Sequence, residues 1–151
     1  MSTTCLVSAC LLGVPCRYDG ASKHHTAVQR WVDTAQARGD TVISVCPEQL
    51  GGLSTPRPAA DLRGGSGAAV LAGSATVQRV HDHKDVTHAF IHGARAAHAL
   101  APTATTALLK ARSPSCGTHS TYIDGVLQPG EGVFAALLRA HGVTLRSEED
   151  L

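Results

Sequence analysis

The chain has few aromatic residues, little net charge and no long apolar run, and each shortage excludes a class of function. Aromatic side chains are 3% of the 151 residues, too few for a platform on which single-stranded bases stack. The net charge of +1 gives no general affinity for nucleic acid or for an acidic membrane surface. No segment approaches the roughly 20 consecutive apolar residues of a membrane span. We therefore expect neither a nucleic-acid polymer nor a membrane as partner.

Signals for export and for disulfide frameworks are missing as well. The first residues, "MSTTCLVSACLLG", lack the basic region and the long apolar core of a signal peptide. We therefore expect a cytoplasmic protein, in which thiols stay reduced. The chain nevertheless has five cysteines, and none of them form a CxxC pair. In this setting cysteines indicate a metal site, an iron–sulfur cluster or thiol catalysis before disulfides.

The pattern of apolar residues predicts one α/β domain over residues 1–151. Short β-type runs alternate with segments of helical periodicity, and hydrophobic residues are 43% of the chain, enough for a core. This alternation is typical of a Rossmann-like, three-layer domain with a mainly parallel sheet. The expected strands are 4–9, 41–45, 105–110 and 143–146, and the expected helices are 27–38, 86–100 and 133–141.

Three segments lack a clear period. Residues 47–67 are rich in glycine and proline, which predicts a long binding loop without regular structure. Residues 68–80 are apolar on both sides of Gly73, which predicts a hairpin around Gly73 and Ser74. The segment "STYIDGVLQPGEG" is expected to be an irregular loop or a hairpin.

Three cysteines follow closely on predicted core strands. They are Cys10 in "VSACLLG", Cys46 in "ISVCPEQLGG" and Cys116 in "ARSPSCGTHS". Ligands of parallel sheets bind beyond the carboxyl ends of the strands, so we expect these thiols to converge on one rim. By contrast, Cys5 lies inside a strand and is expected to be an apolar filler. Cys16, on a polar loop, is expected to be a spectator, although it is close enough to Cys10 to reach the rim.

Three converging thiolates are compatible with more than one centre. A structural zinc ion takes four protein ligands, so the fourth would have to be Cys16 or a histidine. A four-iron cluster on three cysteines would leave one iron open, and an iron of this kind suits a sulfur ligand. Spacing alone does not decide between them. The "HDH" segment at 81–83 is interpreted as solvated histidine, because a zinc site needs more ligands.

Four sequence blocks resemble a known family. They are "SACLLG...CRYDG", "CPEQLGGLSTPRPAADL", "KDVTHAFIHGA" and "LLKARSPSCG", and the likeness continues to "GEGVFAALLRAHGVTL". In this order they are similar to the TudS family of thiouracil desulfidases. The resemblance implies removal of sulfur from thiolated pyrimidines without net redox change. It also implies a [4Fe-4S] cluster that three cysteines hold, with one iron not ligated by protein and free for the substrate sulfur.

The resemblance also implies roles for individual residues. The cluster ligands would be Cys10, Cys46 and Cys116, and the catalytic residues would be Glu48 of "CPE" and Ser113, the first serine of "SPSCG". Many members of the family have valine at the position of Cys16, which implies that this thiol is not a required ligand.

Four polar residues are candidates for substrate contact. Arg17, Asp19 and Lys23 lie on the loop after Cys10, and Arg57 lies between two prolines. The alternative for the three loop residues is a solvated surface, the default for charged side chains. The expected partner is a small thiopyrimidine, as 2-thio or 4-thio base or as thiouridine monophosphate, and the chain is expected to be a monomer or a homodimer. Two other functions stay open: a structural metal or cluster module, and a thiol enzyme with a histidine base.

Overall fold

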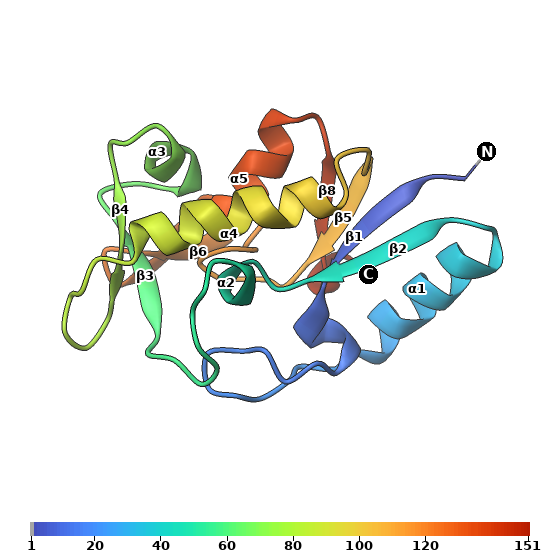
Figure 1. Cartoon of the computed structure of the whole chain (residues 1–151), viewed down its shortest axis with the longest axis horizontal. Helices are drawn as coiled ribbons and strands as arrows, with labels where there is room; N and C mark the ends of the chain where they lie inside the picture. Colours follow the sequence, from blue (N-terminus) through green and yellow to red (C-terminus); the bar gives the residue numbers. More distant parts are fainter. Residues whose placement is uncertain (1) are drawn as a thin grey trace.

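The computed structural model describes residues 2–151, and it contains two four-stranded sheets (Figure 1). The first sheet is entirely parallel. Its strands, in spatial order, are β2 (Thr41–Val45), β1 (Thr4–Ser8), β5 (Thr106–Leu109) and β8 (Thr144–Ser147). Because β1 pairs with both β2 and β5, these three strands end side by side.

The second sheet is mixed. Its strands, in spatial order, are β4 (Thr76–Arg79), β3 (Ala60–Arg63), β6 (Ser120–Ile123) and β7 (Val126–Pro129). The outer pairs are antiparallel, and β3 runs parallel to β6 with Leu62 opposite Ile123. Both residues belong to the same hydrophobic core as the first sheet, so the two sheets share one interior.

Helices cover the two faces of the first sheet. The helices are α1 (Thr26–Ala37), α2 (Pro47–Leu50), α3 (Gly67–Leu71), α4 (Thr87–Leu100) and α5 (Val133–Ala140), with 3-10 turns η1 (Ala9–Leu12) and η2 (Glu148–Asp150). Successive residues of β1 point to opposite faces. Leu6 packs in the core that α4 and α5 fill, and Val7 packs with Val28 and Val32 of α1. Within the described residues, no helix is both long and apolar enough to span a bilayer.

The main elements predicted from the sequence are confirmed, including the parallel sheet and the helices α1, α4 and α5. The hairpin prediction for 68–80 is wrong: its first arm is the helix α3, and only β4 is a strand. A run of four or five apolar residues has no decisive period, and here Ser66 precedes a stretch of good helix formers. The segment 47–67 is also more ordered than expected, because it contains α2 and β3. The single sheet that we expected is therefore only half of the architecture.

Two glycines let α2 pack directly against α4. The Cα of Gly93 faces the carbonyl of Pro47, and the Cα of Gly51 faces the carbonyl of Ala89. A Cβ atom at either glycine would overlap a backbone carbonyl oxygen of the other helix. Because α2 also holds Glu48, this contact fixes the position of a candidate catalytic residue.

Replacing Gly93 by alanine should therefore destabilise the fold. Backbone atoms cannot move aside as a flexible side chain would, and overpacking of this kind costs about 1–3 kcal/mol. Urea denaturation of Gly93→Ala should show this loss in the free energy of unfolding. The matched control is His92→Ala, an exposed position on the same helix, which should stay within about 0.5 kcal/mol of wild type. Equal stability of the two variants would contradict the tight contact.

Candidate functional site

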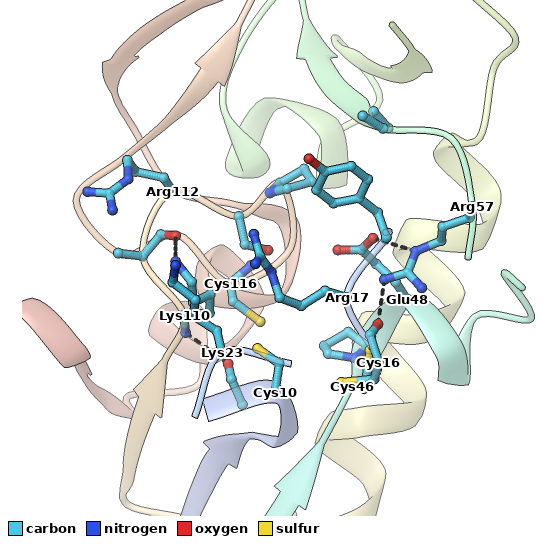
Figure 2. Close-up of a pocket in the computed structure, with 18 of the residues that line it drawn as sticks. Cys10, Cys16, Arg17, Lys23, Cys46, Glu48, Arg57, Lys110, Arg112 and Cys116 are labelled. Carbon is cyan, nitrogen blue, oxygen red and sulfur yellow. Dashed lines mark hydrogen bonds and ion pairs between the residues drawn. The ribbon is translucent and has the colours of Figure 1, made fainter. Parts of the chain in front are cut away.

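A cavity of about 500 Å³ lies beyond the ends of β2, β1 and β5 (Figure 2). Its wall includes Ser8, Val45 and Lys110 at the ends of these strands, and residues of the second sheet close the opposite side. This volume is in the usual range for a site that binds a small molecule. The position agrees with the general rule for ligands of parallel sheets.

Cys10, Cys46 and Cys116 all line this cavity. Cys10 lies in η1, directly after β1, and Cys46 is the residue between β2 and α2. Cys116 lies on the loop that follows β5. Cys10 and Cys116 are buried and Cys46 is half-buried. Three thiols from separate parts of the sequence thus face one space.

The loop that presents Cys116 is held on two sides. The hydroxyl oxygen of Ser113 accepts hydrogen bonds from the amides of Ser115 (3.2 Å) and Cys116 (3.1 Å). The carbonyls of Pro114 and Ser115 accept hydrogen bonds from the first turn of α5, from Val133 (2.9 Å) and from Ala135 (3.0 Å). The thiol therefore comes from a fixed backbone and not from a mobile loop.

Two of these thiols, those of Cys46 and Cys116, hold their protons tightly. Burial is the main cause that raises the pKa of Cys116 to about 12, against the opposing effect of a hydrogen bond with Ser8. Hydrogen bonding with Cys16 and then burial also raise the pKa of Cys46. A metal centre that binds thiolates must displace these protons, so assembly and proton release are coupled.

The donor set fits a soft, sulfur-rich centre. Thiolates are the ligands that iron–sulfur clusters use, and Cys10, Cys46 and Cys116 are the thiols that the strand ends supply. Within residues 2–151, no three His, Cys, Asp or Glu side chains come close enough to hold a single metal ion. A four-iron cluster is larger than a single metal ion, and its thiolate ligands lie further apart. The volume of the cavity is therefore the quantity to compare with the size of a cluster.

Glu48 lies in the same cavity, beside Arg57 (Figure 2). It is in the first turn of α2, two residues after Cys46. One carboxylate oxygen accepts a hydrogen bond from Nε of Arg57 at 2.9 Å, and the other accepts one from the hydroxyl of Ser115 at 3.0 Å. A carboxylate has about four acceptor sites, so the group can still accept from water or substrate.

Arg57 is engaged with the protein more fully than the sequence suggests. Besides Glu48, its guanidinium donates to the carbonyls of Ser54 (3.3 Å) and Cys16 (3.0 Å) and to the hydroxyl of Thr55 (3.0 Å). Its side chain is only 5% exposed. This placement favours a role in positioning Glu48 over direct contact with a substrate.

The other candidate contact residues divide into two groups. Arg17 and Lys23 line the cavity, whereas Asp19 does not, and its carboxylate accepts from the amide of Ala21 at 3.0 Å. Lys110 and Arg112 also line the cavity, but each is paired with an acid, Glu148 at 3.1 Å and Glu149 at 2.6 Å. Among the described residues, no ion pair involves Arg17 or Lys23.

Three residues of the site were not predicted from the sequence. Ser115 contacts Glu48, Ser8 contacts the thiol of Cys116, and Cys16 lines the cavity with a buried thiol. No sequence signal separates Ser113 from Ser115 in "SPSCG", because the direction in which each side chain points depends on the conformation of the turn. Two other interpretations agree with the structure: Cys5 is a buried residue of β1 away from the cavity wall, and the "HDH" segment is exposed with Asp82 paired to Arg79.

Comparison with known proteins identifies the family of this chain. The sequence model of the 2-thiouracil desulfurase family matches residues 5–150. The chain is 39% identical to an uncharacterized protein of Bacillus subtilis, YbbK, over 97% of this chain and 96% of that protein. It also resembles a solved structure, the [4Fe-4S]-dependent thiouracil desulfidase TudS, at 42% identity and a TM-score of 0.82, over 99% of this chain and 93% of that one. The chain belongs to the 2-thiouracil desulfurase family.

Removing one of the three cysteines should prevent assembly of a cluster. We expect Cys10→Ala, Cys46→Ala and Cys116→Ala each to lose most of their iron after anaerobic reconstitution, because each change removes one of three ligands. Cys5→Ala is the control, since Cys5 does not line the cavity, and it should keep the wild-type iron content. The measurement is iron per chain with the visible absorption spectrum. Full iron content in any of the three variants would remove that residue from the ligand set.

Proposed function

We propose that this protein is a non-redox desulfidase that converts a thiolated pyrimidine and water to the uracil compound and hydrosulfide. The observation that carries the proposal is the meeting of Cys10, Cys46 and Cys116 with Glu48 in one cavity, in a chain of this family. In the reaction the carbon–sulfur double bond is replaced by carbon–oxygen from water. No electrons are gained or lost, so no reductant is required.

Cys10, Cys46 and Cys116 are the residues that would hold a [4Fe-4S] cluster. When bound, the cluster would supply one iron that none of these three cysteines ligates. This iron would bind the substrate sulfur and make the ring carbon more electrophilic. The three cysteines lie on segments that follow neighbouring strands, so they would hold the cluster in the cavity that Glu48 also lines.

Glu48 would act as the general base. Its carboxylate is anchored by Arg57 and Ser115 and still has free acceptor sites, so it can take a proton from the water that attacks the ring carbon. Direct attack by the carboxylate is less favourable, because an ester-like bond would remove the negative charge that faces the guanidinium of Arg57. The same carboxyl group can then return the proton to the departing sulfur.

The two serines have different parts in this arrangement. Ser115 is buried and directs Glu48, whereas Ser113 lines the cavity and its oxygen already accepts two amide hydrogen bonds. The hydroxyl proton of Ser113 is the donor that this residue can offer to the Cys116 thiol, to water or to substrate. We assign Ser113 to substrate or water positioning and Ser115 to carboxylate positioning.

Two alternatives fit less well. A thiol enzyme of the Cys–His type needs a histidine within hydrogen-bond reach of its nucleophile, and within the described chain no histidine lines the cavity. A structural metal module does not need a carboxylate held by an arginine and a serine beside the thiols. The set of residues around Glu48 therefore favours turnover.

Glu48→Gln should separate cluster binding from chemistry. The amide keeps the size of the side chain but cannot accept the proton, and loss of a general base typically costs about 10²–10⁴-fold in rate. Iron content should match wild type while hydrosulfide release from thiouracil and from thiouridine monophosphate falls by this factor. Ser115→Ala should lose less.

The matched control is Glu131→Gln, which changes a carboxylate paired with Arg139 outside the cavity wall. This variant should turn over at the wild-type rate. Wild-type turnover by Glu48→Gln with both substrates would show that the glutamate is structural and that another group moves the proton.

The charge of the cavity wall favours a substrate that carries a phosphate. Arg17 and Lys23 are the wall cations outside the ion pairs described above, and both belong to the segment after Cys10. The amide of Lys23 donates to the carbonyl of Cys10 at 2.9 Å, so the main chain of Lys23 has a fixed place beside the candidate ligand. We propose that these two residues bind the phosphate of a thiopyrimidine nucleotide, which an arginine or a lysine recognises by charge.

Lys23→Gln and Arg17→Gln should therefore discriminate between nucleotide and free base. We expect KM for thiouridine monophosphate to rise about 5- to 30-fold, as for a loss of about 1–2 kcal/mol. KM for thiouracil should stay unchanged, and Arg30→Gln, an exposed change on α1, should affect neither substrate. Equal effects on base and nucleotide would show that the two cations do not contact a phosphate.

A further inference from the structure

The cavity contains a fourth thiol that the family resemblance does not assign. Cys16 lines the same wall as Cys10, Cys46 and Cys116, and it is only 2% exposed. Figure 2 shows its side chain beside that of Cys46. It thus differs from Cys5, whose thiol accepts from the hydroxyl of Thr106 inside the sheet and does not reach the cavity.

The backbone holds Cys16 in this place from both sides. Its amide donates to the carbonyl of Val14 at 2.8 Å, which closes a tight turn through Pro15. Its carbonyl accepts from Arg57 at 3.0 Å and from the thiol of Cys46 at 3.6 Å. The residue is therefore linked to a candidate cluster ligand and to the arginine that holds Glu48, so its inward position is built into the site.

The buried thiol of Cys16 has only weak partners in the protein. It lies beside Cys46 in the cavity wall (Figure 2), and thiol–thiol hydrogen bonds are weak. A thiolate is a much better ligand for an iron of a cluster than water is. Because Cys16 lies on the protein already, its effective concentration at that iron is in the millimolar range or above, as for ligands joined by a short linker.

We propose that Cys16 is a labile fourth ligand, which binds the iron left free by Cys10, Cys46 and Cys116 when no substrate is present. The inference rests on the proposed function. On binding, the thiol gives its proton to solvent, and an iron–sulfur bond replaces an iron–water bond. When the substrate sulfur takes this iron, Cys16 leaves and regains a proton from solvent. Neither step transfers an electron.

The test compares wild type with Cys16→Val, which removes the ligand and keeps an apolar side chain of similar size. The control is Cys5→Val, which removes a buried thiol outside the cavity wall. All three proteins are reconstituted anaerobically and titrated with hydrosulfide, and the visible spectrum reports binding at the iron. We expect equal iron content in all three. The Kd for hydrosulfide should be lower in Cys16→Val than in the other two by about tenfold or more, because no internal thiol competes.

Two results would overturn this inference, and both differ from a failure of the proposed function. Equal Kd values in wild type and Cys16→Val would show that Cys16 does not occupy the iron. Loss of iron from Cys16→Val, as complete as that from Cys46→Ala, would make Cys16 an obligatory ligand and not a labile one. If wild type assembled no iron–sulfur cluster, the proposed function itself would fail before this comparison began.

Discussion

Parallel pairing of β1 with β2 on one side and with β5 on the other fixes the positions of all the candidate ligands. In this register Ser8 lies opposite Val45, and Val7 lies opposite Leu108. Three chain segments therefore leave the sheet at the same edge, and each bears a cysteine soon after the strand ends. Main-chain hydrogen bonds thus bring the thiols together before any cofactor does. A cluster that binds here adds its free energy to an arrangement that the core already supports.

Arg57 is the second constraint on which the site depends. Its guanidinium connects Glu48 on α2 with the carbonyl of Cys16, and its side chain is 5% exposed against 14% for the carboxylate. An ion pair that is this buried contributes little net stability, but loss of one partner leaves an uncompensated charge and costs about 3–5 kcal/mol. We therefore attribute the ion pair to the orientation of Glu48 and not to the stability of the fold. The pair holds the carboxylate of Glu48 in one orientation in the cavity that the three cysteines also line.

The sequence predicts the first sheet well because its elements depend on local patterns. The β-branched run at 41–45 and the helical period at 27–38 are visible without knowledge of partners. The second sheet is not visible in this way, since Leu62 and Ile123 become neighbours only through the tertiary fold. For the same reason the interior of 47–67, which contains β3, had no sequence signal beyond its glycines and prolines.

The site shows the same division between local and non-local information. Glu48 and Ser113 could be proposed from blocks that resemble a family, but the contact between Ser115 and Glu48 spans α2 and the loop after β5. The assignment of Arg57 to a substrate contact followed from its position between two prolines, and only the fold shows how many of its donors are already used. The polar loop around Cys16 predicts a spectator thiol, although a polar loop can still direct one thiol inward.

The cations of the cavity wall that lie outside the ion pairs are Arg17 and Lys23, and both belong to the segment that also contains Cys16. Lys110, Arg112 and Arg57 are each neutralised by a glutamate, which leaves Arg17 and Lys23 as the cations that can attract an anionic substrate. Arg17 is also the residue that follows Cys16. In the proposed mechanism a nucleotide that binds Arg17 therefore contacts the same segment whose thiol must leave the iron. In these proposals, recognition of the phosphate and release of the fourth ligand would therefore involve adjacent residues, Cys16 and Arg17.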